Sequence, residues 1–312
     1  MVRYLIRVGY IGTKYKGIQK QAVNQNDTIQ DVVESALLTL KPRNIPNTHF
    51  ASRTDKGVHA LMNAFHVDLE HKVPGEIYQP HQIRIKMNSY FTENDHEIAV
   101  TNSSIVPETF HCRYHAKWRS YYYRLAILKH GLKIPINSLS HQGYLPTAEI
   151  NRCHLVSSTL NTSIVKNVTD LFCGEHDFTT FTKYLVREPW KNPRRTIHEC
   201  QFYQTTYNGF IKDPLYANIS MWEFYIQSKA FLYHQVRKLV GTALSAGFGY
   251  LSLSDVKSML DNPDPDRWKF CRLAPPGGLF LAHIEYDKKD FNAPISLKEE
   301  DIGNENEEPN CE

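Results

Sequence analysis

Apolar and polar residues alternate along several short stretches of the chain, and this pattern predicts strands that bury one face. In residues 2–10, Tyr4, Ile6 and Val8 share one parity while Arg3 and Arg7 fall on the other. This predicts a strand with one buried and one wet face. Strands are predicted over residues 2–10, 61–69, 98–106, 196–203 and 221–227 and over the segment that ends at Tyr286.

Apolar residues at helical spacing predict helices elsewhere. In the first of these stretches Ile29, Val33 and Leu37 fall on one face, and Thr28 is the expected N-cap. Such a helix serves to pack the core. Helices are predicted over residues 28–40, 147–160 (capped by Thr147) and 229–247 (ended by Gly247), and residues 79–90 predict a short helix or a loop.

Length and charge narrow the class of protein. The 312 residues are enough for two domains or one large one, and 41% hydrophobic with 22% charged residues is ordinary for a globular protein. Residues 298–312 hold seven acidic side chains and one basic one, so the rest of the chain is more basic than the overall net charge of +3. A basic body with an acidic end favours a polyanion as partner, and a mildly basic protein without such a partner is the alternative.

Cysteine usage and hydropathy bear on the compartment. The six cysteines show no closely spaced pairs, which favours a reduced, intracellular protein over a disulfide scaffold. No apolar run approaches the length of a membrane span, so no membrane association is expected. Arg3 and Arg7 interrupt the position of a secretory signal. The pattern does not distinguish cytoplasm, nucleus and mitochondrion.

The first stretch with candidate chemistry is residues 51–60, Ala-Ser-Arg-Thr-Asp-Lys-Gly-Val-His-Ala. It places Asp55 between Arg53 and Lys56, after a loop and before the predicted strand at 61–69. An acid on a loop beside a rigid strand is typical of active-site residues. A solvated turn with a local ion pair is the alternative.

A second stretch, residues 110–125, interleaves basic and aromatic side chains. If it is extended without a bulge, one face carries alternate residues. Cations for phosphate and flat rings for bases are what single-stranded RNA needs, whereas a Tyr-rich strand without RNA would be core. The residues on that face are Arg113, His115, Lys117, Arg119, Tyr121 and Tyr123.

The run Arg-Thr-Asp-Lys-Gly-Val-His-Ala around Asp55 resembles the signature of the TruA family of RNA pseudouridine synthases. Further blocks resemble the same family in the same order, over roughly residues 3–287, and the set looks most like the animal tRNA pseudouridine synthase-like subgroup. The blocks are residues 10–21, Phe110–Tyr123, the Gly-x-x-Asp-Phe-x-x-Phe run ending at Phe181, Ala-Phe-Leu-Tyr-His-Gln-Val-Arg ending at Arg237, and residues 274–281.

Four positions depart from the family pattern. Ser52 stands where Gly is usual, a departure expected to touch no catalytic group, and Ile18 replaces a common Trp. Cys112 and Tyr114 replace the usual Ala and Phe.

The resemblance implies roles for individual residues. Asp55 would be the catalytic nucleophile, Arg237 its ion-pair partner, and Tyr121 the ring that stacks on the target base. Arg53 would enter the RNA as the uridine leaves, and Leu279 would line the uracil pocket. No cofactor is implied. The expected catalytic residues are Asp55, Arg237 and Tyr121, and the expected substrate-binding residues are Arg53, Leu279, Tyr123, Arg119 and Lys14.

The resemblance also implies an α/β (α+β) fold with two related halves around a central basic cleft. Each half would be a mostly antiparallel sheet with helices on one side. The expected divisions are an N-terminal half at 1–105, a C-terminal half at 106–290, and an acidic disordered tail at 291–312. The expected substrate is tRNA, at uridines of the anticodon stem-loop, and a homodimer is a further expectation.

Two rival interpretations remain at this point. Cys112 with His115, and Cys173 with His176, are Cys-x-x-His pairs of a spacing that zinc can use, although their order is unusual and the family blocks explain both stretches without metal. A non-catalytic RNA-binding module of the same fold is the other rival. The joint presence of Asp55 with its expected partners argues against it.

Basic residues at 183–195 form an additional candidate RNA-facing patch or a solvated loop.

Overall fold

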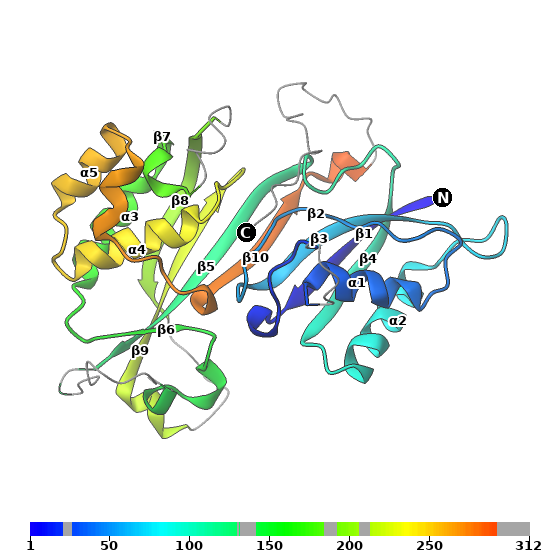
Figure 1. Ribbon diagram of the computed structural model, residues 1–312, viewed down its shortest axis with the longest axis horizontal. Helices are drawn as coiled ribbons and strands as arrows, with labels where there is room; N and C mark the ends of the chain where they lie inside the picture. The colour runs from blue at the N-terminus through cyan, green and yellow to red at the C-terminus, as the bar shows by residue number, and fades with distance from the viewer. Residues whose placement is uncertain (21–26, 130, 132–141, 184–191, 206–212, 292–312) are drawn as a thin grey trace.

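The computed structural model describes residues 1–20, 27–129, 131, 142–183, 192–205 and 213–291, and one 10-stranded sheet runs through them (Figure 1). The strand order is β4-β1-β3-β10-β5-β9-β8-β7, with β2 beside β3 and β6 beside β5. Both parallel and antiparallel pairs occur, so the expected mixed α/β fold is confirmed. No helix in the described ranges is both long and apolar enough to cross a membrane.

The N-terminal part of the sheet is antiparallel. Helices α1 (Ile29–Leu38) and α2 (Pro80–Glu93) lie side by side against it, on the right in Figure 1. Leu5 is buried together with Tyr4 and Ile6, so β1 does not have the fully wet face that alternation predicted. Other side chains of the Leu5 face also contact main chain that covers it: Arg3 Nη1 donates to the Phe110 carbonyl oxygen at 3.0 Å and Arg7 Nη1 to the Ile284 carbonyl oxygen at 3.2 Å. The strands are β1 (Val2–Tyr10), β2 (His49–Phe50), β3 (His59–Leu69) and β4 (Ile98–Val106).

The C-terminal part holds the longest strand, β5 (Ala116–Leu128), paired with β9 along its length. Three helices, α3 (Thr162–Phe172), α4 (Gln235–Gly247) and α5 (Leu253–Asp261), pack on one another beside these strands, on the left in Figure 1. The remaining strands are β6 (His154–Val156), β7 (Gly174–Asp177), β8 (Arg194–Gln204) and β9 (Ile219–Ser228).

The two parts are joined by β10 (Leu279–Tyr286), the last strand of the described chain. It runs antiparallel to β5 and meets β3 in a short parallel pairing, Phe280 opposite His59 and Leu281 opposite Ala60. The start of β3 is where the Asp55 loop ends. This strand therefore places the Asp55 loop next to the Tyr-rich strand β5.

Two predicted helices are corrected by the structure. Residues 147–160 contain a 3-10 turn, Thr147–Glu149, and the strand β6, and no helix; Thr147 is not an N-cap. The sequence His154–Val156 pairs with Leu125–Ile127 of β5, a long-range pairing that local spacing cannot reveal. The helix of this region is α3, which Asn161 caps by accepting from the amides of Ser163 and Ile164.

The predicted helix 229–247 begins later than expected, at Gln235, because His234 has a left-handed backbone with φ of 60°. Residues 79–90, predicted as a short helix or a loop, form most of α2, which continues to Glu93 and has a capping box between Gln79 and Gln82. The central basic cleft and the domain divisions stay predictions. Residues 292–312, most of the predicted tail, and Arg187 and Lys191 of the predicted patch lie outside the described residues.

Candidate active site

Asp55 lies on the loop that connects β2 to β3. The loop closes in a turn in which the Val58 amide donates to the Asp55 carbonyl oxygen at 3.1 Å. Gly57 in this turn has φ of +77°, and a Cβ there would meet the Pro276 ring at 3.2 Å. Glycine is therefore required both by the left-handed backbone and by the close approach of Pro276.

Hydrogen bonds from several segments fix this loop. The Ile18 amide donates to the Thr54 carbonyl oxygen at 3.1 Å, and the Tyr10 hydroxyl lies 2.8 Å from Thr54 Oγ1. Asn63 Nδ2 donates to the Ser52 carbonyl oxygen at 3.0 Å. These bonds fix Ser52 and Thr54 just before Asp55, and the bond from the Val58 amide closes the turn after it, so the carboxylate is held in place before any substrate binds.

The structure brings Arg237 of α4 to Asp55, as the sequence predicted. Arg237 Nη1 lies 3.1 Å from Asp55 Oδ2, and Arg237 Nε donates to the Ala274 carbonyl oxygen at 2.8 Å. The side chains are 11% and 22% exposed, so this pair is largely removed from water. A charge-assisted bond in such surroundings orients the carboxylate toward the guanidinium.

His234 is a second partner of Asp55, and the sequence analysis missed it. His234 Nε2 lies 3.3 Å from Asp55 Oδ2, and its ring stacks on Tyr233 with centroids 3.8 Å apart. Burial, with help from the positive charge of Arg237, lowers the pKa of His234 to about 4, against the opposing pull of Asp55. The imidazole is therefore neutral at pH 7. The sequence offered one signal for this role of His234, namely its position three residues before Arg237.

Tyr121 of β5 lies beside the same loop. It is 6% exposed, and its hydroxyl lies 2.9 Å from Ser52 Oγ. Its ring meets the partly exposed Phe231 edge to face, with centroids 5.2 Å apart. Burial raises the pKa of Tyr121, so its hydroxyl is protonated at neutral pH. Ser52, expected to touch no catalytic group, thus bonds to the proposed stacking residue.

Arg119 and Tyr123, both expected to contact substrate, lie inside the protein. Arg119 Nη2 donates to the carbonyl oxygens of Ala51 at 2.9 Å and of Arg113 at 2.8 Å. The Tyr123 hydroxyl donates to the Pro275 carbonyl oxygen at 3.0 Å. Alternation correctly placed both side chains on the same face of β5 as Tyr121. Their contacts, however, are to the protein's own main chain, and they hold the Asp55 loop and the segment before β10 in position.

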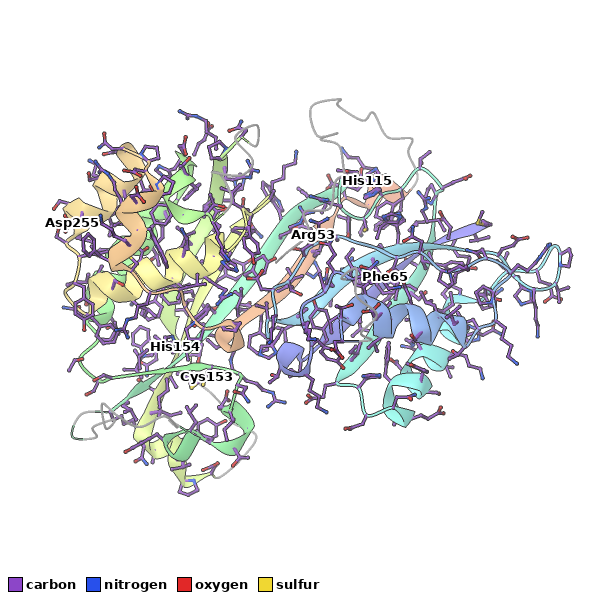
Figure 2. All side chains as sticks on the ribbon, viewed as in Figure 1. Arg53, Phe65, His115, Cys153, His154 and Asp255 are labelled. Atoms are coloured by element: carbon purple, nitrogen blue, oxygen red, sulfur yellow. The ribbon has the colours of Figure 1, made fainter. Side chains whose placement is uncertain are left out.

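The other expected substrate-binding residues differ in exposure. Arg53 is exposed near the centre of the molecule, where Figure 2 labels it. Lys14 is half exposed and forms an ion pair with Asp95 at 3.3 Å. Leu279 is buried and stands opposite Tyr123 in the β10–β5 ladder. Of these three residues, Arg53 is the one that directly precedes the Asp55 turn.

The two Cys-x-x-His pairs do not form as ligand pairs. His115 Nδ1 bonds to the His111 carbonyl oxygen at 3.0 Å, and its ring stacks on Phe110. His176 Nε2 bonds to the carbonyl oxygen of Cys173 at 3.0 Å. In both pairs a histidine nitrogen is thus bound to main chain.

Comparison with known proteins gives matches along most of the chain. The sequence profile described as tRNA pseudouridine synthase matches residues 6–115 and 168–287. The chain is 30% identical over 292 residues to "tRNA pseudouridine synthase-like 1" of Xenopus laevis, covering 93% of each chain. It is 29% identical over 286 residues to "tRNA pseudouridine synthase A" of Bartonella quintana (strain Toulouse), covering 92% of this chain and 100% of the relative.

Among solved structures, one in "Crystal Structure of a Cbf5-Nop10-Gar1 Complex" matches 77% of this chain and 44% of its own, with 12% identity and a TM-score of 0.28. That likeness is too weak to support an inference. The sequence matches are much stronger, and they contain both members of the central ion pair: Asp55 lies in the first matched segment and Arg237 in the second. The chain therefore belongs to the tRNA pseudouridine synthase family.

Proposed function

We propose that this enzyme converts uridine to pseudouridine in the anticodon stem-loop of tRNA, with Asp55 as the nucleophile and Tyr121 as the ring on which the base stacks. The observation that carries the proposal is the Asp55 carboxylate, fixed on its loop and held 3.1 Å from Arg237 Nη1. The tRNA substrate follows from the family, whose relatives are named tRNA pseudouridine synthases. The anticodon arm follows from the TruA resemblance of the sequence.

The reaction breaks the N1–C1′ glycosidic bond, turns the base and forms a C5–C1′ bond, and the hydrogen on C5 leaves. A nucleophile is needed when the first bond breaks. The guanidinium of Arg237 orients the Asp55 carboxylate, and the bond from Arg237 to Ala274 fixes the direction of the guanidinium. The groups named here, from Asp55, Arg237 and Ala274, all belong to the protein chain.

The target uridine must leave the RNA stack to reach Asp55. Flipping a base costs a few kcal/mol, and stacking on an aromatic ring returns about 1–3 kcal/mol. Because Tyr121 is 6% exposed and Phe231 lies against it, stacking requires Phe231 to move aside when RNA binds. Arg53, exposed two residues before Asp55, would occupy the vacated position in the RNA.

The test is release of tritium from tRNA labelled with [5-³H]uridine, measured for wild type and Asp55→Asn. Asp95→Asn is the matched control, because Asp95 is an exposed aspartate that pairs with Lys14. We expect release by wild type and by Asp95→Asn, and none by Asp55→Asn, which still binds tRNA. Release by Asp55→Asn at the wild-type rate would exclude Asp55 as nucleophile. Binding without release by wild type would favour the non-catalytic RNA-binding module.

The position in tRNA is tested separately, with labelled hairpins that correspond to single arms. We expect the anticodon stem-loop hairpin to release tritium and a hairpin of the T arm to release none. Release from the T-arm hairpin alone would overturn the anticodon assignment and leave the chemistry intact.

A further inference from the structure

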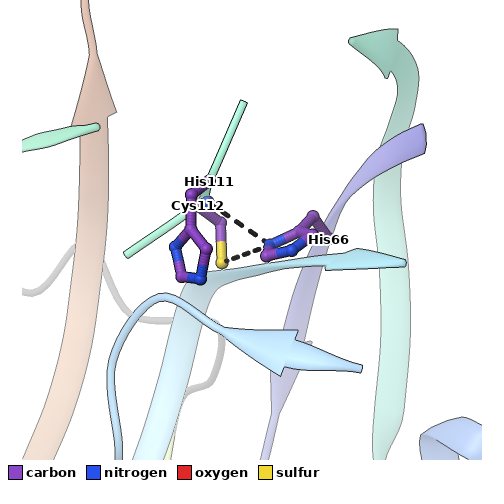
Figure 3. Close-up of side chains that lie close together, drawn as sticks. All are labelled: His66, His111 and Cys112. Carbon is purple, nitrogen blue, oxygen red and sulfur yellow. Dashed lines mark hydrogen bonds between the residues drawn. The ribbon is translucent and has the colours of Figure 1, made fainter. Parts of the chain in front are cut away.

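Two histidines and a cysteine lie close together beside β3. His66 comes from β3, and His111 and Cys112 come from the connection between β4 and β5 (Figure 3). One ligand atom from each of the three side chains can be chosen so that all three atoms lie within 4.8 Å of one another. His66 Nδ1 is 3.2 Å from Cys112 Sγ and 3.4 Å from the Cys112 amide.

The surroundings of this cluster are closed on one side and open on the other. His66 and Cys112 are buried, whereas His111 is partly exposed and the neighbouring His49 is exposed. The His49 ring stacks on His66 with centroids 4.9 Å apart, and the His66 and His111 rings lie 4.6 Å apart, edge to face. His111 is therefore the member of the cluster that solvent, and with it an entering ion, reaches first.

We propose that His66, His111 and Cys112 bind one zinc ion. Two imidazoles and one thiolate are ligands that zinc prefers, and three protein ligands leave its fourth position to water. Zn–S of about 2.3 Å and Zn–N of about 2.0–2.1 Å place sulfur and nitrogen roughly 3.5 Å apart in a tetrahedral site. The separation of Cys112 Sγ from His66 Nδ1, 3.2 Å, is within a few tenths of an ångström of that spacing.

Binding involves proton release and no redox step. In the free protein the Cys112 thiol donates to the His49 carbonyl oxygen at 2.9 Å. Zinc takes the sulfur as thiolate, so the thiol proton passes to solvent and this hydrogen bond is replaced by the Zn–S bond. The two histidines bind as neutral imidazoles.

The ion would tie β3 to the connection that leads into β5, the strand that carries Arg119 and Tyr121. His66 stands opposite His49 in the pairing of β3 with β2, and His49 directly precedes Phe50 and the Asp55 loop. Zinc would thus stiffen the base of that loop. The proposal does not depend on the role of Asp55 or on the RNA substrate.

The experiment uses the full chain, stripped with a chelator and then titrated with zinc chloride. Zinc per chain is measured after gel filtration by elemental mass spectrometry, beside the melting temperature. Cys112→Ala is the test variant, because the family pattern has alanine here and the fold is expected to accept it. Cys173→Ala is the matched control, since Cys173 is exposed and outside the cluster.

We expect one zinc per chain and a higher melting temperature for wild type and Cys173→Ala. Cys112→Ala should bind zinc at least about tenfold more weakly and show no rise in melting temperature. Cobalt(II) is a second probe: a sulfur-to-cobalt charge-transfer band should appear in wild type and Cys173→Ala and be absent in Cys112→Ala. Failure of stripped wild type to take up zinc, or equal uptake by Cys112→Ala, would overturn the proposal.

Discussion

Arg237 and Asp55 are 182 residues apart in sequence, and Arg237 Nη1 lies 3.1 Å from Asp55 Oδ2. Arg237 belongs to α4 in the C-terminal part, and Asp55 to a loop that ends at β3 in the N-terminal part. The pair therefore forms only when β10 joins β3 to β5 in one sheet. The ion pair couples the geometry of the site to the assembly of the two parts.

Arg237→Gln should lower kcat/KM by roughly 100-fold, because it removes the charge that orients the Asp55 carboxylate and the bond to Ala274. Tritium release from labelled tRNA measures the change. Arg267→Gln is the control, since Arg267 is an exposed arginine that bonds to Ser258. An Arg237→Gln enzyme with wild-type kcat/KM would show that the pair is not needed for the reaction.

The variant His234→Asn should lose less folding stability in mild acid than the wild-type protein does. Burial lowers the pKa of His234 to about 4, so between pH 6.5 and 4 the unfolded chain binds a proton here that the folded chain does not. Folding stability contributed by this site is therefore complete above pH 6.5 and falls as the pH drops toward 4. The expected difference between pH 7 and pH 5 is on the order of 1 kcal/mol.

Urea unfolding at pH 7 and pH 5 measures this effect as the change in the free energy of unfolding. Asparagine is chosen because, like the histidine it replaces, it tolerates the left-handed backbone with φ of 60°. The control is His81→Asn, at an exposed position of α2. Equal acid sensitivity in His234→Asn and wild type would contradict the buried, neutral imidazole.

Arg119→Met should destabilise the protein and reduce activity together. Its guanidinium is buried and bonds to the carbonyl oxygens of Ala51 and Arg113, which the substitution leaves unpaired. Loss of such partners costs about 1–3 kcal/mol, measured by urea unfolding. The Asp55 loop loses its anchor at Ala51, so tritium release should fall as well.

The control for Arg119→Met is Arg84→Met, at an exposed position of α2. If Arg119 instead served only to bind RNA phosphates, its substitution would weaken tRNA binding and leave the free energy of unfolding unchanged. The two roles are therefore separated by the unfolding measurement alone.

Local signals predicted the elements whose formation is local. Helix α1 lies where the apolar stripe placed it, and Thr28 accepts from the Asp31 amide as an N-cap should. The region 147–160 failed because β6 forms by pairing with β5, far away in sequence. The start of α4 was missed because His234 has a left-handed backbone and contacts Asp55, and neither feature can be read from the local sequence.

The same distinction applies to the site. The family resemblance of two separate blocks was enough to predict that Arg237 and Asp55 meet. Alternation was enough to place Arg119, Tyr121 and Tyr123 on one face of β5. It did not show that this face is turned toward the protein's own main chain, because burial of a strand face depends on which elements cover it.

The contact between Ser52 and Tyr121 predicts a measurable coupling between them. Their hydroxyl oxygens lie 2.9 Å apart in partly buried surroundings, so removing either hydroxyl should cost about 1 kcal/mol of stability by leaving the other unpaired. In a double-mutant cycle of Ser52→Ala and Tyr121→Phe, the second change should therefore cost much less once the first has been made. Urea unfolding of the four proteins gives this coupling free energy. Tyr121→Phe keeps the ring, so tritium release should persist if stacking is its role, whereas abolished release at undiminished stability would assign the hydroxyl a part in the chemistry.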